Sequence, residues 1–168
     1  MITDWHTFCT DEGGGFMEWT ETHDDLEHLM KRELETLRQL LANMHLEEQF
    51  IMKKQKKYWG AMMEERERLF EQLESIRLHR GDTTKKIEHL FSLKDAPLEE
   101  LLPPQHGASF EILSLRDQMI TLVDRMSLQT SRNEMLKSLV EAQSKQLPKK
   151  KITVATLSQE EYKERDAS

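Results

Sequence analysis

The sequence predicts an all-α protein: an elongated antiparallel helical hairpin or small bundle with coiled-coil packing and short connector helices. Apolar residues make up only 37% of the 168 residues, against roughly 45–50% in an average globular domain counted with glycine, so a thick compact core is not expected. Only six glycines and four prolines interrupt the chain. Apolar residues also recur with a seven-residue period over two long stretches, which is typical of coiled-coil seams.

Residues 1–21 are expected to form an irregular arm, because Gly13, Gly14 and Gly15 interrupt it. The arm nevertheless holds two of the three tryptophans, Trp5 and Trp19, and disordered segments are usually poor in aromatic residues. It therefore either folds back onto the helices or docks a partner.

A first long helix is predicted over residues 22–80. Thr22 and Asp25 resemble a capping box at its start, and Gly81 can close its end in a left-handed conformation. At 1.5 Å per residue such a helix would be about 90 Å long. Its seam contains Met30, Leu34, Leu37, Leu41, Met44, Ile51, Tyr58, Met62, Leu69 and Ile76.

The seam of this first helix weakens near residues 53–60. Glu48 and Gln55 occupy core-type positions, four lysines lie between residues 53 and 57, and Gly60 costs a helix about 1 kcal/mol relative to alanine. A kink or functional opening is one interpretation. We favour a continuous helix with a solvated basic turn.

Residues 82–108 are predicted to be a connector, with Pro97 at the start of a short helical turn. A second long helix is predicted over residues 109–147, with Ser109 as its N-cap. Its seam reads Ile112, Leu115, Met119, Leu122, Met126, Gln129, Asn133, Leu136 and Val140. After it, residues 148–168 are predicted to be a flexible charged tail, because residues 158–168 have no apolar stripe.

Charge and hydropathy exclude several classes of partner. With 31 Asp and Glu against 24 Lys and Arg, the net charge is -7, whereas a nucleic-acid binder normally has a basic face. No stretch approaches the roughly 20 apolar residues of a membrane span, and the N-terminus lacks the pattern of a secretory signal. The single cysteine, Cys9, allows no internal disulfide. We expect a cytoplasmic protein with neither nucleic-acid binding nor membrane insertion.

The sequence also lacks the patterns of catalytic, metal and cofactor sites. His23 and His28 are five residues apart, whereas metal ligands on one helix lie three or four apart. The three consecutive glycines lack the strand and the Lys-Ser/Thr pair of a phosphate loop, and clustered carboxylates such as those of residues 64–68 are typical of a solvated helix face. We therefore predict no catalytic residue, metal or cofactor, and a binding protein rather than an enzyme.

Asn133 stands out because it lies in the seam of the second helix. One interpretation is a register residue paired with a polar group such as Glu48 or Gln55 on the facing helix. The second is a partner-binding face, on which the methionines either fill an ordinary core or adapt to varied partners. On that interpretation Asn133→Leu should raise heat stability but weaken or broaden binding. The third is exposure of Asn133 to solvent. The predicted partner-binding face comprises Leu122, Met126, Asn133, Leu136 and Val140.

The layout of residues 26–147 resembles that of the FlgN-type flagellar export chaperones. The resemblance rests on a glutamate-rich stretch over residues 64–73, a Pro-Leu-Glu-Glu-Leu-Leu turn over residues 97–102, and a last helix with Leu122, Arg132, Asn133, Leu136 and Leu139. The family often has two asparagines three residues apart there, and this chain has Thr130 at the earlier position. The resemblance implies a bacterial cytoplasmic chaperone that holds hook–filament junction subunits before type III export and binds a client helix through its C-terminal helical region.

Two function classes follow from these observations. The first is a chaperone that shields the amphipathic segment of an exported client, with at most weak homodimerisation. The second is a structural coiled-coil component or tether, including a stalk-like secretion apparatus protein, that has no client. A client binder should gain heat stability when its client peptide is added, whereas a structural rod should already be a stable oligomer.

Overall fold

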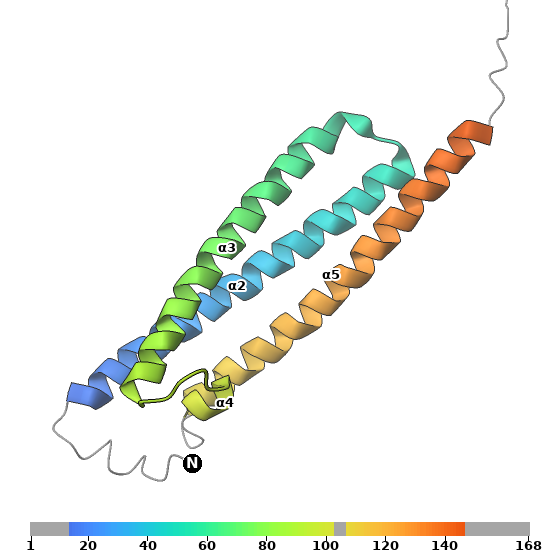
Figure 1. Cartoon of the computed structure of the whole chain (residues 1–168). Coiled ribbons are helices and arrows are strands. Elements are labelled where there is room, and N and C mark those ends of the chain that lie inside the picture. The colour runs from blue at the N-terminus through green and yellow to red at the C-terminus, as the bar shows by residue number, and fades with distance from the viewer. Residues whose placement is uncertain (1–13, 103–106, 147–168) are drawn as a thin grey trace, which may run out of the picture.

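The computed structural model describes residues 14–102 and 107–146, and within them every regular element is helical. The prediction of an all-α small bundle is confirmed (Figure 1). The elements are α2 (Gly14–Lys53), the short 3-10 helix η1 (Lys56–Tyr58), α3 (Trp59–Leu90), α4 (Leu98–Leu101) and α5 (Gly107–Gln146).

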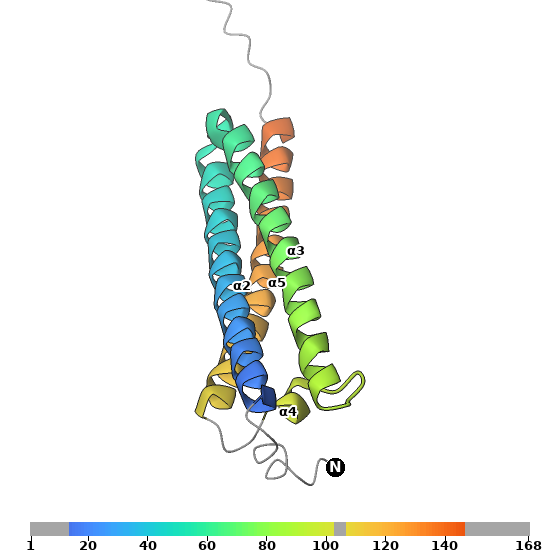
Figure 2. The same cartoon turned by 90° about the vertical axis from the view of Figure 1, so that its left-hand side faces the viewer.

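Helix α2 organises the bundle. It packs against both α3 and α5, whereas α3 and α5 hardly contact each other. Helix α3 runs back alongside α2, and α5 then runs in the same direction as α2 (Figures 1 and 2). Within the described part of the chain, no helix combines the length and the apolar character needed to cross a membrane.

The predicted continuous helix over residues 22–80 is wrong, because the chain reverses direction after α2 ends at Lys53. Lys54 adopts a left-handed conformation with φ 54°, and the amide of Gln55 donates to the carbonyl of Phe50 at 3.0 Å. This is how helices commonly end. A straight helix would leave its apolar stripe in water, whereas the reversal lets the two halves of the stripe bury each other.

The predicted helix end at Gly81 is also wrong. Helix α3 continues through Gly81 to Leu90, so residues 82–90 of the predicted connector are helical. Thr83 and Ile87 are buried in this last part of α3, and their burial outweighs the roughly 1 kcal/mol that glycine costs a helix.

The structure tests the predicted boundaries at the two ends of the chain only in part. Helix α2 begins at Gly14, so the prediction of an irregular arm is wrong over residues 14–21. Residues 1–13 and the predicted tail at 148–168 lie outside the described residues. Helix α5, at Gly107–Gln146, lies close to the predicted 109–147.

The apolar core occupies the half of the bundle near α4. It joins all the α-helices, and its end is closed by Leu101 of α4 and by Leu102, which directly follows α4. The core side chains on the three long helices are Leu26, Met30, Leu34, Leu37, Leu40, Leu69, Leu73, Ile87, Ile112, Leu115 and Met119. Beyond Leu40 the buried positions of α2 include the polar Asn43 and Glu47, so the far half of the bundle has a mixed interior.

Candidate functional site

Helices α3 and α5 form the walls of an open groove whose floor is α2. Near α4 the groove widens into a hollow of about 480 Å³, lined by side chains that include Leu37 of α2, Arg77 of α3, and Ile120 and Val123 of α5. Ile120 is 54% exposed and Val123 is 45% exposed. The α5 wall is therefore apolar and open to solvent.

The α3 wall of the groove is apolar as well. Phe70, Leu73 and Arg77 line a second hollow of about 440 Å³ on α3, and Arg77 also lines the first. Met63 and Phe70 precede Arg77 at intervals of seven residues, so all three lie on one side of α3. Met63 and Phe70 are both exposed, which extends the apolar wall away from α4.

A buried carboxylate supports the floor of the groove. Glu33 of α2 accepts hydrogen bonds from the Nε atoms of Arg77 and Arg80, each at 2.8 Å. The Glu33 side chain is almost fully buried, whereas both arginines remain partly exposed. Two guanidinium groups share one carboxylate, so this part of the groove has a net positive charge.

Beyond the apolar core, Glu47 of α2 links all three long helices. It accepts hydrogen bonds from Arg66 Nη2 of α3 at 2.7 Å and from Asn133 Nδ2 of α5 at 3.0 Å, and Lys137 Nζ of α5 lies 2.6 Å from Oε1. Burial raises the pKa of Glu47, but the hydrogen bonds from Lys137, Arg66 and Asn133 together lower it below its ordinary value. Glu47 is therefore ionised at neutral pH.

Further polar contacts extend the network around Glu47. Arg66 Nε donates to Asn43 Oδ1 at 2.8 Å, and Gln129 Nε2 donates to Asn133 Oδ1 at 2.9 Å and to Glu48 Oε2 at 2.7 Å. Arg132 pairs with Glu48 at 2.7 Å. The network therefore ties α3 to α2 and α5 to α2 at the same level of the bundle.

The structure places Asn133 in this network. It is 2% exposed and donates to the carbonyl of Met44 at 2.9 Å as well as to Glu47. Its side-chain partner on the facing helix is thus Glu47, rather than the Glu48 or Gln55 that the sequence suggested, and Glu48 pairs with Gln129 and Arg132 instead. In this fold Asn133 has the contacts expected of a register residue.

The other predicted site residues lie on the same side of α5. Leu122 and Met126 are partly buried against the core, and Leu136 is half-buried. Val140 lies further on, in a separate hollow at the α2–α3 turn. Because the side that carries these residues packs against α2, a partner bound there would displace α2.

The contacts of Asn133 change the expected effect of leucine at this position. Asn133→Leu should lower the free energy of unfolding by about 1–3 kcal/mol, because the polar groups around it lose their partner inside the bundle. Urea denaturation followed by circular dichroism measures this. Ser131→Leu, which adds a leucine at an exposed position of α5, is the control. Higher stability of Asn133→Leu would mean that the network contributes nothing net.

Sequence analysis missed Glu47 and the α3 wall. A continuous helix over residues 22–80 places Arg66 and Phe70 far along a rod, away from Glu47. Neither the Arg66–Glu47 contact nor a groove wall that contains Phe70 could therefore be expected. The lysines at 53–57 followed by Gly60 were the available signal, because together they favour a helix end.

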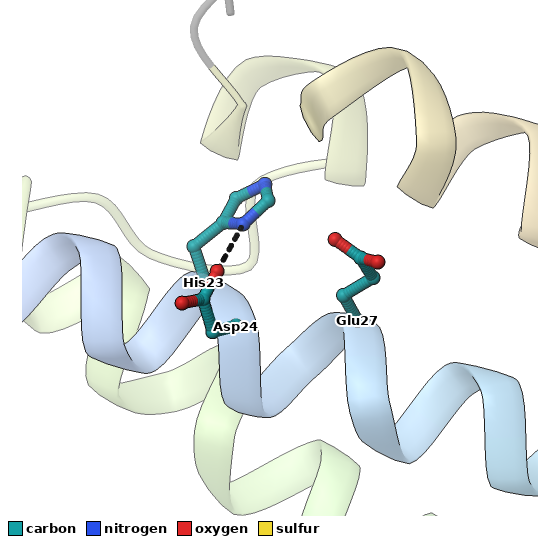
Figure 3. Close-up of side chains that lie close together, drawn as sticks. All are labelled: His23, Asp24 and Glu27. Atoms are coloured by element: carbon teal, nitrogen blue, oxygen red, sulfur yellow. Dashed lines mark ion pairs between the residues drawn. The ribbon is translucent and has the colours of Figure 1, made fainter. Parts of the chain in front are cut away.

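His23, Asp24 and Glu27 form a second candidate site near the start of α2 (Figure 3). One ligand atom from each lies within 4.8 Å of the others, and His23 Nδ1 is 3.8 Å from Asp24 Oδ1. The spacing of the histidines alone does not reveal this group, because it depends on the four-residue spacing of His23 and Glu27. Lys31 already forms an ion pair with Glu27. The group offers three ligands from neighbouring positions of one helix, whereas structural zinc sites have four protein ligands. This group is the weaker candidate.

Comparison with protein-family models, with curated proteins and with solved structures finds no match to this chain. The function is therefore inferred from the geometry of the groove and of the Glu47 network.

Proposed function

We propose that the protein is a helical chaperone that holds an amphipathic helix of a partner protein in the groove between α3 and α5. The observation that carries this proposal is that α3 and α5 both pack on α2 but hardly on each other, which leaves Phe70, Ile120 and Val123 exposed along the opening. In four-helix bundles a fourth helix covers such a surface. An amphipathic helix in an apolar groove is a recurring mode of peptide recognition.

The proposed client is an exported protein of a type III secretion system or flagellum, such as a hook–filament junction subunit. The resemblance of residues 26–147 to FlgN-type chaperones supports this client class. On this proposal the protein acts in the cytoplasm before export, by binding alone and without a cofactor. The net positive charge at Arg77 and Arg80 favours a client helix with an acidic residue beside its apolar stripe.

The groove can be tested with helical peptides from hook–filament junction subunits of the source organism, titrated by calorimetry. The wild-type chain should bind at least one of these peptides. Phe70→Asp and Val123→Asp should each weaken that binding about tenfold or more, because each puts an unpaired charge on an apolar wall. Leu128→Asp is the matched control, since it adds the same charge at an exposed leucine of α5.

Two results would contradict the groove proposal. The first is equal weakening by Leu128→Asp and Val123→Asp, which would place the client elsewhere on α5. The second is the absence of binding by every junction-subunit peptide, which would reject the client class.

A structural coiled coil without a client is the second candidate function. It is favoured by an apolar stripe on α5, where Leu128, Met135 and Leu139 are 73%, 59% and 52% exposed and recur at intervals of seven and four residues. A second copy of the chain could cover this stripe. Sedimentation as a stable dimer that Leu128→Asp converts to a monomer would favour this candidate over the chaperone.

A further inference from the structure

The α2–α3 turn lies beside the last turns of α5 (Figure 1). Side chains of the turn and of α5 line a third hollow. Its volume of about 600 Å³ lies within the roughly 300–1,000 Å³ of typical binding pockets. Apolar and basic side chains share its lining with the polar side chains of Gln55 and Ser144 and with one carboxylate, that of Glu141. The lining includes Phe50, Trp59 and Val140 on the apolar side and Lys54, Lys56 and Lys137 on the basic side.

The lysines of this turn are unusual in an acidic chain. Within the described residues, Lys53, Lys54, Lys56 and Lys57 make no ion pair, although the net charge of the chain is -7. Lys53 lies in the last turn of α2, where a cation stabilises the helix dipole. That explanation does not extend to Lys54, Lys56 and Lys57, which lie beyond the end of α2. Lys57 lies over the ring of Tyr58, with its Nζ 5.6 Å from the ring centre.

Lys137 differs from Lys54 and Lys56 because it already contacts a carboxylate and an aromatic ring. Its Nζ contacts Glu47 at 2.6 Å and lies 5.2 Å from the centre of the Trp59 ring. A cation at this distance from an indole is attracted to the ring face. Lys137 therefore helps to hold Trp59 in place, and the charges left for a ligand are those of Lys54 and Lys56.

The apolar side of the hollow includes the aromatic rings of Phe50 and Trp59, each of which contacts a neighbouring side chain. The rings of Phe50 and Tyr58 stack with their centroids 5.9 Å apart, and both Phe50 and Trp59 remain partly exposed. Tryptophan and tyrosine are the residues that most often dominate binding energy at protein interfaces. An apolar side chain of a ligand can thus enter a hollow that is largely preformed.

We propose that this basic tip, formed by Phe50, Lys54, Lys56, Trp59 and Val140, binds an acidic linear segment of a partner protein. One aromatic or aliphatic side chain of the segment enters the hollow between Trp59 and Val140, and neighbouring carboxylates pair with Lys54 and Lys56. Charge complementarity selects this occupant, because Lys54 and Lys56 make no ion pair within the described residues and outnumber Glu141, the acidic residue in the lining.

Other anionic surfaces fit the tip less well. A nucleic acid needs an extended basic face, and the chain as a whole is acidic. A membrane surface takes up apolar side chains that project outward from a helix, whereas Trp59 and Val140 line a hollow. The tip shares no lining residue with the two hollows of the α3–α5 groove, so the inference goes beyond the proposed function and does not depend on it.

The test is fluorescence anisotropy with a labelled glutamate-rich peptide that has one central phenylalanine. The full chain should bind it saturably and more weakly at high salt, because salt screens exposed charges. The double variant Lys54→Glu/Lys56→Glu should weaken binding about tenfold or more, since each reversal replaces an attraction with a repulsion. Val140→Asp should also weaken it, while Phe70→Asp should leave it unchanged.

The matched control is Lys85→Glu/Lys86→Glu, which changes the net charge equally at two exposed lysines of α3. Equal weakening by this control would overturn the proposal, because binding would then reflect overall charge. Tighter binding of phosphatidylserine vesicles or of an oligonucleotide than of the peptide, with the same dependence on Lys54 and Lys56, would also overturn it. Circular dichroism of each variant separates loss of binding from loss of folding.

Discussion

Replacement of Glu47 by leucine should lower the free energy of unfolding by about 3 kcal/mol. The change leaves Arg66 and Lys137 without their shared carboxylate, and removal of one partner of a buried ion pair typically costs about 3–5 kcal/mol. We expect the lower end of this range because the Lys137 side chain is 42% exposed and water can solvate it. Urea denaturation of the wild type and the variant measures the difference.

A matched control for Glu47 is Glu35→Leu. Glu35 also lies on α2 and pairs with an arginine, Arg38, but both side chains are exposed, and exposed pairs contribute about 0–1 kcal/mol. Equal losses for the two variants would show that the network around Glu47 adds nothing to an ordinary surface pair.

The contribution of Glu47 to the free energy of unfolding should also depend on pH. Its pKa in the folded protein lies below its ordinary value, so the folded state binds fewer protons than the unfolded state in the pH range between the two pKa values. The stabilisation is fully present above the unfolded pKa and is lost as pH falls through the folded pKa. The stability difference between wild type and Glu47→Gln should therefore shrink on acidification, and a difference that grows would contradict this assignment.

Leu40→Ala should have an effect of similar size, a loss of about 3–4 kcal/mol. Leu40 of α2 is fully buried in the apolar core, and truncation of a buried leucine removes apolar contacts and leaves a cavity. Thermal and urea denaturation measure the loss. Leu46→Ala, at an exposed position of the same helix, should change stability far less.

The mode of unfolding tests the central position of α2. Because α2 is the helix that both neighbours pack on, Leu40→Ala should lower the stability of the whole bundle in one transition. Two separate transitions, only one of which shifts, would show that α5 unfolds independently of the α2–α3 pair.

The fold class could be predicted from the sequence because it depends on local features. The seven-residue apolar period and the scarcity of glycine each favour helices, and α5 was placed to within two residues at its start. The reversal at Lys54 could not be predicted in the same way. The apolar stripes before and after it have the same period in a straight helix and in a hairpin, and only their mutual burial decides between the two.

The candidate site was less predictable, because it depends on how distant residues align. The seam position of Asn133 follows from its spacing alone, but its pairing with Glu47 instead of Glu48 depends on the relative register of α2 and α5. Phe70 and Arg77 become groove residues only when α3 folds back beside α2. At Gly81 a local signal gave the wrong prediction. The glycine favours a helix end, but α3 continues past it because Ile87 is buried against the core.

The shared role of α2 sets an order for folding during synthesis. Its links to α3 are local, since Glu47 and Arg66 are 19 residues apart, whereas Glu47 and Asn133 are 86 residues apart. Local contacts form faster, and a ribosome releases the N-terminal part of a chain first. The α2–α3 hairpin can therefore assemble while α5 is still being translated, and until α5 arrives the nascent hairpin exposes the apolar side of α2 that α5 will cover.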